Sequence, residues 1–306
     1  MSKTALWHGI YPAVLTPFTA DEEIDYDMFK KNILFQIDAG ISGIILAGTL
    51  GEASTLTAQE KFDLLTFSKS IVPESFPVLL NIAEQTTREA VEIAKKAKEL
   101  GADGLMLLPP MRYKASDREV VTYFGAVASA TDLPILIYNN PVDYGIHVTP
   151  DMFAELEKYP TIQAVKESTR DLTNVTRMIN RFGDRFKILG GVDTISLETQ
   201  LMGAVGSVAG LVDAFPAETV AIYKLAQAGR LSEALEIYRW FMPLLELDIH
   251  PRLVQYIKLA ATAEGISNEY VRAPRLTLEG EERERILKVI SDARASRPKL
   301  PDYKNL

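Results

Sequence analysis

Lys166 is the residue whose position most strongly indicates chemistry, because it lies within the apolar stretch IQAVKES at 162–168. A solvated lysine has a pKa near ~10.4 and is largely unreactive at neutral pH. Burial disfavours the charged amine, lowers its pKa and leaves a nucleophile that can attack a carbonyl carbon to form a Schiff base. The alternative is a lysine at a strand end whose amine reaches water and has no chemical role.

Two further polar clusters follow apolar runs: GTLGEAS at 48–54 and YNNP at 138–141. Glycines on both sides of Thr49 expose backbone N–H groups, which suit a carboxylate or a developing oxyanion. A tyrosine facing Lys166, such as Tyr138, could move protons to and from the carbinolamine and the imine. Each cluster alone is an ordinary turn or strand end, but together they favour an enzyme.

Short apolar runs alternate with amphipathic segments along the chain and would position these clusters. The runs are bounded by turn residues, which is typical of strands covered on both faces. The expected strands are 11–15, 43–47, 78–82, 104–108, 135–138, 162–166, 186–189 and 207–211. Helices are expected at 57–71, 87–100, 117–130, 149–158, 172–182 and 217–228. Eight strand–helix units predict the α/β class and a (β/α)8 TIM barrel, with the active site at the C-terminal ends of the strands.

The chain continues beyond the expected barrel. We expect residues 1–228 to form the barrel and residues 229–306 to form a C-terminal helical extension packed on the barrel or on a neighbouring subunit. Helical spacing occurs at 231–247, 253–263 and 279–293, and residues 296–306 are expected to be irregular.

Composition excludes several classes of function. The net charge of −8 argues against nucleic-acid binding, and the chain has no cysteine for thiol chemistry or disulfides. No apolar run reaches the ~20 residues that span a bilayer, and residues 1–8 have no apolar core typical of a signal peptide. We therefore expect a cytoplasmic protein with no membrane partner.

The histidines do not predict a metal site. His8, His147 and His250 are far apart, and no His/Glu pair has the spacing of ligands on a helix. Asp248 and His250 most simply form a solvated turn. No cofactor motif is present, and the chemistry of Lys166 needs none.

The three clusters, together with GGVD at 190–193, resemble the dihydrodipicolinate synthase/N-acetylneuraminate lyase family of Schiff-base (β/α)8 enzymes. Their order and spacing match, and the resemblance runs from about Gly9 to the last helix. It implies that Lys166 forms a Schiff base with the 2-oxo carbon of the substrate, without an external cofactor. It also implies that Tyr138 shuttles protons, that Thr49 helps to orient Tyr138, and that the protein is a homotetramer.

The resemblance extends to substrate-binding residues. The backbone around Thr49, Leu50 and Gly51 would hold the carboxylate of a pyruvate-like moiety. The residues that would line the region of the remaining substrate are Gly191, Asp193 and Val208, with Asn140 and Asp143 as further contacts.

Departures from the family pattern narrow the expected substrate. Leu50 replaces the second threonine of the family's Gly-Thr-Thr-Gly-Glu loop, and Tyr113 is displaced by one from the position of a tyrosine that the synthase branch lends to a neighbouring subunit. Asp143 stands where the synthase branch has an arginine that clamps a second carboxylate. Because an acid cannot replace a bidentate carboxylate clamp, we argue against lysine biosynthesis.

A further resemblance is carried by LGEASTLT at 50–57, NIAE at 81–84, YNNPVDY at 138–144 and LD at 247–248. This combination is similar to the 1-pyrroline-4-hydroxy-2-carboxylate deaminases of hydroxyproline breakdown. In that interpretation the substrate is a cyclic imine, the products are 2-oxoglutarate semialdehyde and ammonia, and Asp143, Tyr144 or Glu84 contacts the hydroxyl or the freed amine. For Glu84 a simple role at a helix N-terminus is an equal alternative. The rival enzymes are an aldolase or dehydratase of 2-keto-3-deoxy sugar acids or another pyruvate-dependent aldolase. A rival of a different class is a non-catalytic ligand-binding barrel.

Overall fold

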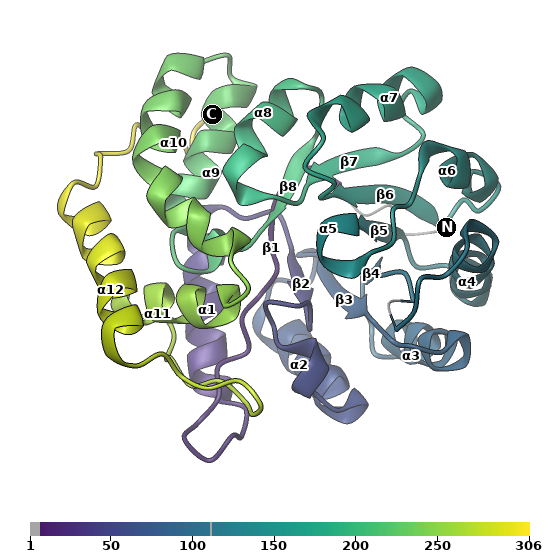
Figure 1. Cartoon of the computed structure of the whole chain (residues 1–306), viewed down its shortest axis with the longest axis horizontal. Coiled ribbons are helices and arrows are strands. Elements are labelled where there is room, and N and C mark those ends of the chain that lie inside the picture. The colour runs from purple at the N-terminus through teal and green to yellow at the C-terminus, as the bar shows by residue number, and fades with distance from the viewer. Residues whose placement is uncertain (1–6, 111) are drawn as a thin grey trace.

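The computed structural model describes residues 7–110 and 112–306, so Met111 and most of the N-terminal segment considered above lie outside the described residues. Eight parallel strands form one sheet in the order β1-β8-β7-β6-β5-β4-β3-β2. A parallel bridge between Ala13 and Ile45 brings the two outer strands together, which closes the barrel (Figure 1). The predicted α/β class and (β/α)8 TIM barrel are confirmed.

All eight expected strands are present. They are β1 (Gly9–Pro12), β2 (Ile44–Leu46), β3 (Val78–Ile82), β4 (Gly104–Leu107), β5 (Ile135–Asn139), β6 (Ile162–Glu167), β7 (Lys187–Gly190) and β8 (Gly206–Ala209). Every residue of β3 and β5 is buried, as expected for strands with helices outside and side chains filling the barrel inside. The expected first strand lies too late in the sequence, because only its first two residues belong to β1.

The helices of the barrel are α1 (Tyr26–Ala39), α2 (Ala58–Ile71), α3 (Thr87–Glu99), α4 (Asp117–Ala130), α5 (Pro141–Tyr144), α6 (Pro150–Leu156), α7 (Leu172–Phe182), α8 (Ser196–Leu201) and α9 (Pro216–Gln227). The six expected barrel helices are all present, as α2, α3, α4, α6, α7 and α9, whereas α1, α5 and α8 match no expected segment. In α3 the residues Ala90, Ile93, Ala94 and Ala97 recur at helical spacing and are all buried. This apolar stripe packs on the barrel, and the polar residues between them face outward.

Three helices follow the barrel: α10 (Leu231–Leu245), α11 (Leu253–Ala263) and α12 (Gly280–Ala295). They lie along one side of the molecule, with α10 beside α9 and α12 beside α10 (Figure 1). The short 3₁₀ helix η4 (Glu246–Ile249) joins α10 to α11 and contacts η2 (Asp193–Ile195) after β7. The C-terminal extension therefore reaches the rim of the barrel. The expected boundary between barrel and extension at residue 228 stays a prediction. Among the described residues, no helix is long and apolar enough to cross a membrane.

Candidate active site

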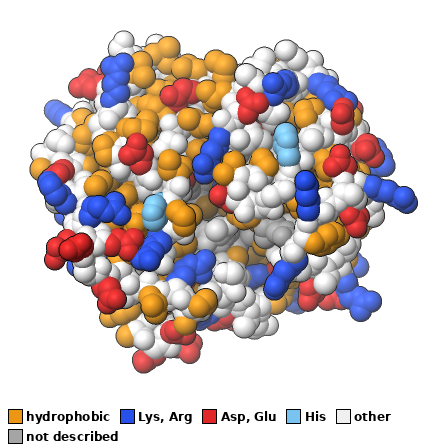
Figure 2. Space-filling view, viewed as in Figure 1, with side chains coloured by type: hydrophobic (Ala, Val, Ile, Leu, Met, Phe, Trp, Pro, Cys, Tyr) orange, Lys and Arg blue, Asp and Glu red, His pale blue; other side chains and the backbone are white. Residues whose placement is uncertain are grey.

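A cavity opens at the C-terminal ends of the strands and collects the predicted polar clusters. Its empty volume is about 660 Å³ including the open mouth, and the face seen in Figure 2 is hollowed near its centre. The predicted residues that line it are Thr49, Leu50, Tyr138, Asn140, Asp143, Lys166, Gly191 and Val208. The side chains that line it and were not predicted as substrate contacts include Met106, Ser168, Arg170 and Asp248.

Lys166 lies near the end of β6, and its side chain is only 7% exposed. Tyr138 of β5 is paired with it in the parallel register, which brings the amine nitrogen to 4.1 Å from the centre of the Tyr138 ring. Burial lowers the pKa of Lys166, and this effect exceeds the opposing influence of Tyr144, Asp248 and other acidic groups. The amine therefore releases its proton more readily than an ordinary lysine, as a Schiff-base nucleophile requires.

Tyr138 is held by the residues that follow it. The side-chain amide of Asn140 donates to the Tyr138 hydroxyl at 3.1 Å and to a carboxylate oxygen of Asp143 at 2.7 Å. Burial raises the pKa of Tyr138 to about 12, so its hydroxyl is protonated at neutral pH. It can therefore donate a proton first and act as a base only afterwards.

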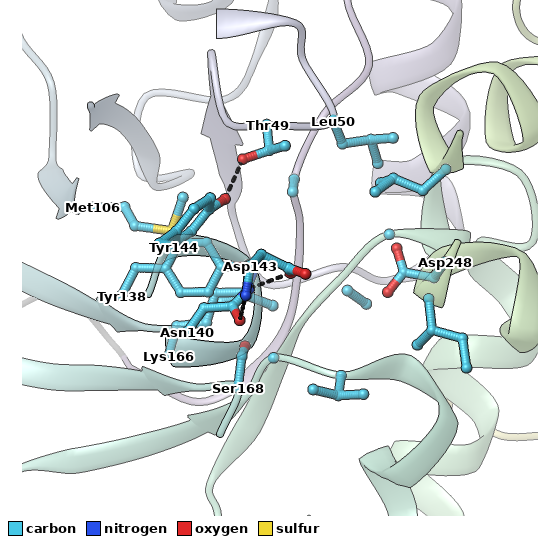
Figure 3. Close-up of a pocket in the computed structure, with 18 of the residues that line it drawn as sticks. Thr49, Leu50, Met106, Tyr138, Asn140, Asp143, Tyr144, Lys166, Ser168 and Asp248 are labelled. Carbon is cyan, nitrogen blue, oxygen red and sulfur yellow. Dashed lines mark hydrogen bonds between the residues drawn. The ribbon is translucent and has the colours of Figure 1, made fainter. Parts of the chain in front are cut away.

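The hydroxyl of Thr49 has a different partner from the one expected. It forms a 2.5 Å hydrogen bond with the hydroxyl of Tyr144, and the Tyr144 ring stands edge-on to that of Tyr138, with ring centres 5.4 Å apart. Thr49 therefore acts on Tyr138 only through the Tyr144 ring (Figure 3). Burial raises the pKa of Tyr144 as well, which keeps this hydroxyl neutral. Tyr113 is 55% exposed, bonds to Glu119 and does not line the cavity in a single chain.

Gly191 provides the space that the Lys166 side chain occupies. A Cβ atom at position 191 would lie 2.7 Å from Cγ and 2.8 Å from Cε of Lys166, and 2.1 Å from Oγ of Ser168. The absence of a side chain at position 191 therefore leaves room for the path of the lysine from β6 to the cavity.

A substitution tests this role. Gly191→Ala is expected to displace the amine and to slow borohydride trapping of the pyruvate adduct by about 10²-fold, because small misplacements of reacting groups cost that much. Trapping is followed by the mass of the intact protein, and thermal unfolding shows whether the fold is kept. An unchanged trapping rate in a folded variant would contradict the role.

Asp193 and Gly51 differ from the prediction, since neither lines the cavity. The carboxylate of Asp193 accepts hydrogen bonds from the backbone N–H groups of Gly210 at 3.1 Å and Leu211 at 2.7 Å. It therefore holds the chain that follows β8 from outside the cavity. The carbonyl of Gly51 accepts from Thr16, and a Cβ at position 51 would lie 2.8 Å from the carbonyl oxygen of Val14. Both residues support the wall of the cavity rather than form it.

Glu84 also lies outside the cavity. Its carboxylate lies 2.7 Å from the amine of Lys61, and it does not line the cavity. The structure therefore does not bring Glu84 to the cavity, where the suggested contact with the substrate would require it, and its carboxylate pairs instead with Lys61 of α2. Asp143 and Tyr144, the other two candidates for that contact, do line the cavity.

Sequence reasoning missed Asp248, which had been interpreted as part of a solvated turn. The residue lies in η4 and lines the cavity on the side opposite Lys166 and Tyr138 (Figure 3). Burial raises the pKa of its carboxyl well above the ordinary value, and the negative charges of Asp193 and Asp143 raise it further, against the effect of Lys166. Leu247 and Asp248 are among the residues that carry the resemblance to the hydroxypyrroline deaminases, but the place of Asp248 at the cavity depends on how the extension folds onto the barrel.

Arg170 is a second cation that lines the cavity. Its backbone has a φ of 62°, the left-handed region that non-glycine residues seldom adopt, and its side chain is exposed. The outer part of the cavity therefore combines one positive charge with the carboxylates of Asp143 and Asp248. Within the described ranges, no group of three or more His, Asp or Glu residues is arranged to hold a metal ion.

Comparisons with known proteins agree with the barrel fold and with the family resemblance of the sequence. A family model described as "Dihydrodipicolinate synthetase family" matches residues 6–293. A 4-hydroxy-tetrahydrodipicolinate synthase of Methanoculleus marisnigri is 30% identical over 291 residues, which cover 93% of this chain and 99% of that protein.

Solved structures give the same result. Dihydrodipicolinate synthase DapA-2 of Bacillus anthracis has a TM-score of 0.90 and 28% identity, over 96% of this chain and 99% of that one. A prophage protein of the dihydrodipicolinic acid synthase family from E. coli K12, solved in complex with pyruvate, has a TM-score of 0.89 and 26% identity, over 95% and 99%.

Proposed function

The chain belongs to the dihydrodipicolinate synthetase family, and from this premise we propose that it deaminates 1-pyrroline-4-hydroxy-2-carboxylate to 2-oxoglutarate semialdehyde and ammonia. Membership makes the protein a lyase of the Schiff-base class, which acts on a small molecule through a covalent lysine adduct and needs no external cofactor. The particular substrate is the proposal.

The first half of the reaction uses Lys166 and Tyr138. The neutral amine of Lys166 adds to C2 of the cyclic imine, and a proton moves from the attacking nitrogen to the ring nitrogen. The bond from C2 to the ring nitrogen then breaks as the hydroxyl of Tyr138 gives that nitrogen a proton. The products are an iminium ion on Lys166, a primary amine on C5 and a phenolate.

The second half removes the hydroxyl and the nitrogen. The phenolate of Tyr138 takes a proton from C3, which the iminium has acidified, and the resulting enamine expels the 4-hydroxyl as water. Loss of a proton from C5 and uptake of one at C4 leave an imine at C5, whose hydrolysis releases ammonia. Tyr138 returns its proton to C3, and water frees the product from Lys166.

The acidic outer wall of the cavity is the observation that carries this proposal. Asp143 and Asp248 line the cavity beyond the reacting lysine. Once the ring is open, the distal part of the proposed substrate holds a hydroxyl and an amine, both of which donate hydrogen bonds to carboxylates. A second substrate carboxylate would instead be repelled by the charge of Asp143 if it lay on this side of the cavity.

The decisive measurement is ammonia release from the hydroxypyrroline carboxylate by the purified protein. Stoichiometric ammonia together with the semialdehyde is expected. Aldol cleavage of a 2-keto-3-deoxy sugar acid would instead yield pyruvate, and its dehydration would yield no ammonia. A preparation that forms the pyruvate adduct but releases no ammonia from the hydroxypyrroline substrate would overturn the proposed substrate and keep the family chemistry.

Arg170 favours a second candidate function, the synthase reaction for which the Methanoculleus marisnigri relative is named 4-hydroxy-tetrahydrodipicolinate synthase. A guanidinium binds carboxylates in a bidentate manner, so Arg170 could hold the second acidic group of a larger substrate from the mouth of the cavity. Consumption of pyruvate together with an amino-aldehyde acid, in the absence of ammonia release, would support this candidate.

The proposal also includes a cytoplasmic homotetramer. The exposed ring of Tyr113 lies against a surface hollow beside α4 and supports a contact with another subunit. Light scattering of the purified protein would measure the mass of the assembly directly.

A further inference from the structure

Asp248 reaches the cavity from the C-terminal extension, not from the barrel. It belongs to η4, and its carboxylate fills the space beside Gly210, where a Cβ atom would lie 2.3 Å from Oδ1 of Asp248. Gly210 follows the last residue of β8, so the barrel leaves room for this side chain at its rim. The carboxylate is therefore positioned by packing against the barrel wall, as a reacting group requires.

Asp248 and Lys166 lie on opposite sides of the cavity and would therefore meet different ends of the substrate. Figure 3 shows Tyr138 and Lys166 on one side of the cavity and Asp248 on the other. A substrate bound covalently to Lys166 extends from C2 toward C5, away from the lysine. C4 and C5 consequently lie on the side of Asp248, whereas C3 stays next to Tyr138.

The other carboxylates near Lys166 are already engaged. Asp143 accepts a hydrogen bond from the Asn140 amide that also holds Tyr138. Asp193 accepts from two backbone N–H groups behind the wall. Asp248 itself accepts a hydrogen bond from the backbone N–H of Asp193. It differs from the other two carboxyls in place, because it lines the cavity on the side away from Lys166 and Tyr138, where the distal part of the substrate would lie.

We propose that Asp248 is a catalytic acid and base for C4 and C5 of the substrate, an inference that rests on the proposed deamination. Its carboxyl gives a proton to the departing 4-hydroxyl, the bond from C4 to oxygen breaks, and water leaves. The enamine electrons form a double bond between C3 and C4, with the positive charge on the Lys166 nitrogen. The carboxylate of Asp248 then takes a proton from C5 and is restored to its acid form.

The protonation behaviour of the Asp248 carboxyl agrees with its role as an acid. Burial and the neighbouring carboxylates raise the pKa of Asp248, which favours the protonated form that the first step needs. The proton lost to the departing water is regained from C5, so Asp248 ends these two steps in its acid form. The proton that C4 takes up afterwards comes from solvent and is released again when the iminium at C5 is hydrolysed.

The variant Asp248→Asn separates this role from the chemistry of Lys166. It removes the transferable proton and keeps the size of the side chain. We expect ammonia release from the hydroxypyrroline carboxylate to fall by about 10²-fold or more, the usual contribution of general acid–base catalysis. Exchange of the pyruvate methyl protons in D2O, followed by NMR, should continue at the wild-type rate, because it uses only Lys166 and Tyr138. Asp248→Glu should recover part of the ammonia release.

Glu246→Gln provides the matched control, since it removes a carboxylate from the same 3₁₀ helix on its exposed side. It should retain both activities. Ammonia release by Asp248→Asn at the wild-type rate would overturn the inference, and so would an equal loss of methyl exchange, because Asp248 would then act by positioning Lys166. Wild-type protein that exchanges the methyl protons but releases no ammonia would instead overturn the proposed substrate.

Discussion

Lys166→Ala is expected to abolish covalent capture of pyruvate and to lower turnover by on the order of 10⁴-fold or more, as removal of a nucleophile does in other enzymes. The variant keeps the cavity but has no amine within reach of the 2-oxo carbon. Lys166→Arg should be equally inactive, because a guanidinium is never deprotonated in a protein and cannot form the imine. Borohydride reduction in the presence of pyruvate, followed by the mass of the intact protein, measures the adduct.

Lys187→Ala is the matched control, since this lysine lies at the start of β7 in an exposed pair with Asp184. Its adduct yield should equal that of the wild type. The wild-type trapping rate should also rise with pH and level off with a midpoint below 10.5, because burial lowers the pKa of Lys166 and the free amine is the reactive form. A Lys166→Ala protein that still gained the mass of pyruvate would exclude Lys166 as the nucleophile.

The barrel could be predicted because its signals are local. Each strand is a short apolar run between turn residues, and each helix repeats its apolar residues at helical spacing, as α3 illustrates. The reactive pair was predictable for the same reason. Tyr138 and Lys166 end neighbouring parallel strands, so they must meet at the same rim.

Contacts that depend on packing between distant segments could not be predicted. Asp248 enters the cavity only because η4 folds against the end of β7. The partner of Thr49 depends on where the four-residue helix α5 places Tyr144, and no helix is expected at 141–144 from the sequence. The ion pair of Glu84 could not be foreseen either, because its partner Lys61 lies on α2, 23 residues earlier in the chain.

Lys258→Met is expected to lower the free energy of unfolding by about 3–5 kcal/mol, the usual cost of removing one partner of a buried ion pair. Neither Lys258 nor Glu52 is exposed, and the amine lies 2.6 Å from the Glu52 carboxylate. The amine also donates to the carbonyl of Tyr270 at 2.6 Å. Because the variant leaves Glu52 buried with less compensation, the loss should appear as a lower urea midpoint at an unchanged slope. Lys288→Met, which breaks an exposed pair on α12, should change stability by less than about 1 kcal/mol.

The ion pair of Lys258 with Glu52 connects the C-terminal extension to the loop at 48–54, which carries Thr49. Glu52 follows Thr49 and Leu50, and its backbone has a φ of 58°, so the loop keeps a left-handed residue that its surroundings must hold in place. Lys258→Met should therefore slow pyruvate trapping as well as weaken the fold. The double variant Glu52→Gln with Lys258→Met should recover part of the stability, because it leaves no unpaired carboxylate in the interior. If Lys258→Met alone were as stable as the wild type, the extension would not be anchored through this pair. Other contacts between the extension and the barrel, such as the ion pair of Arg297 with Glu218, would then hold η4 in place.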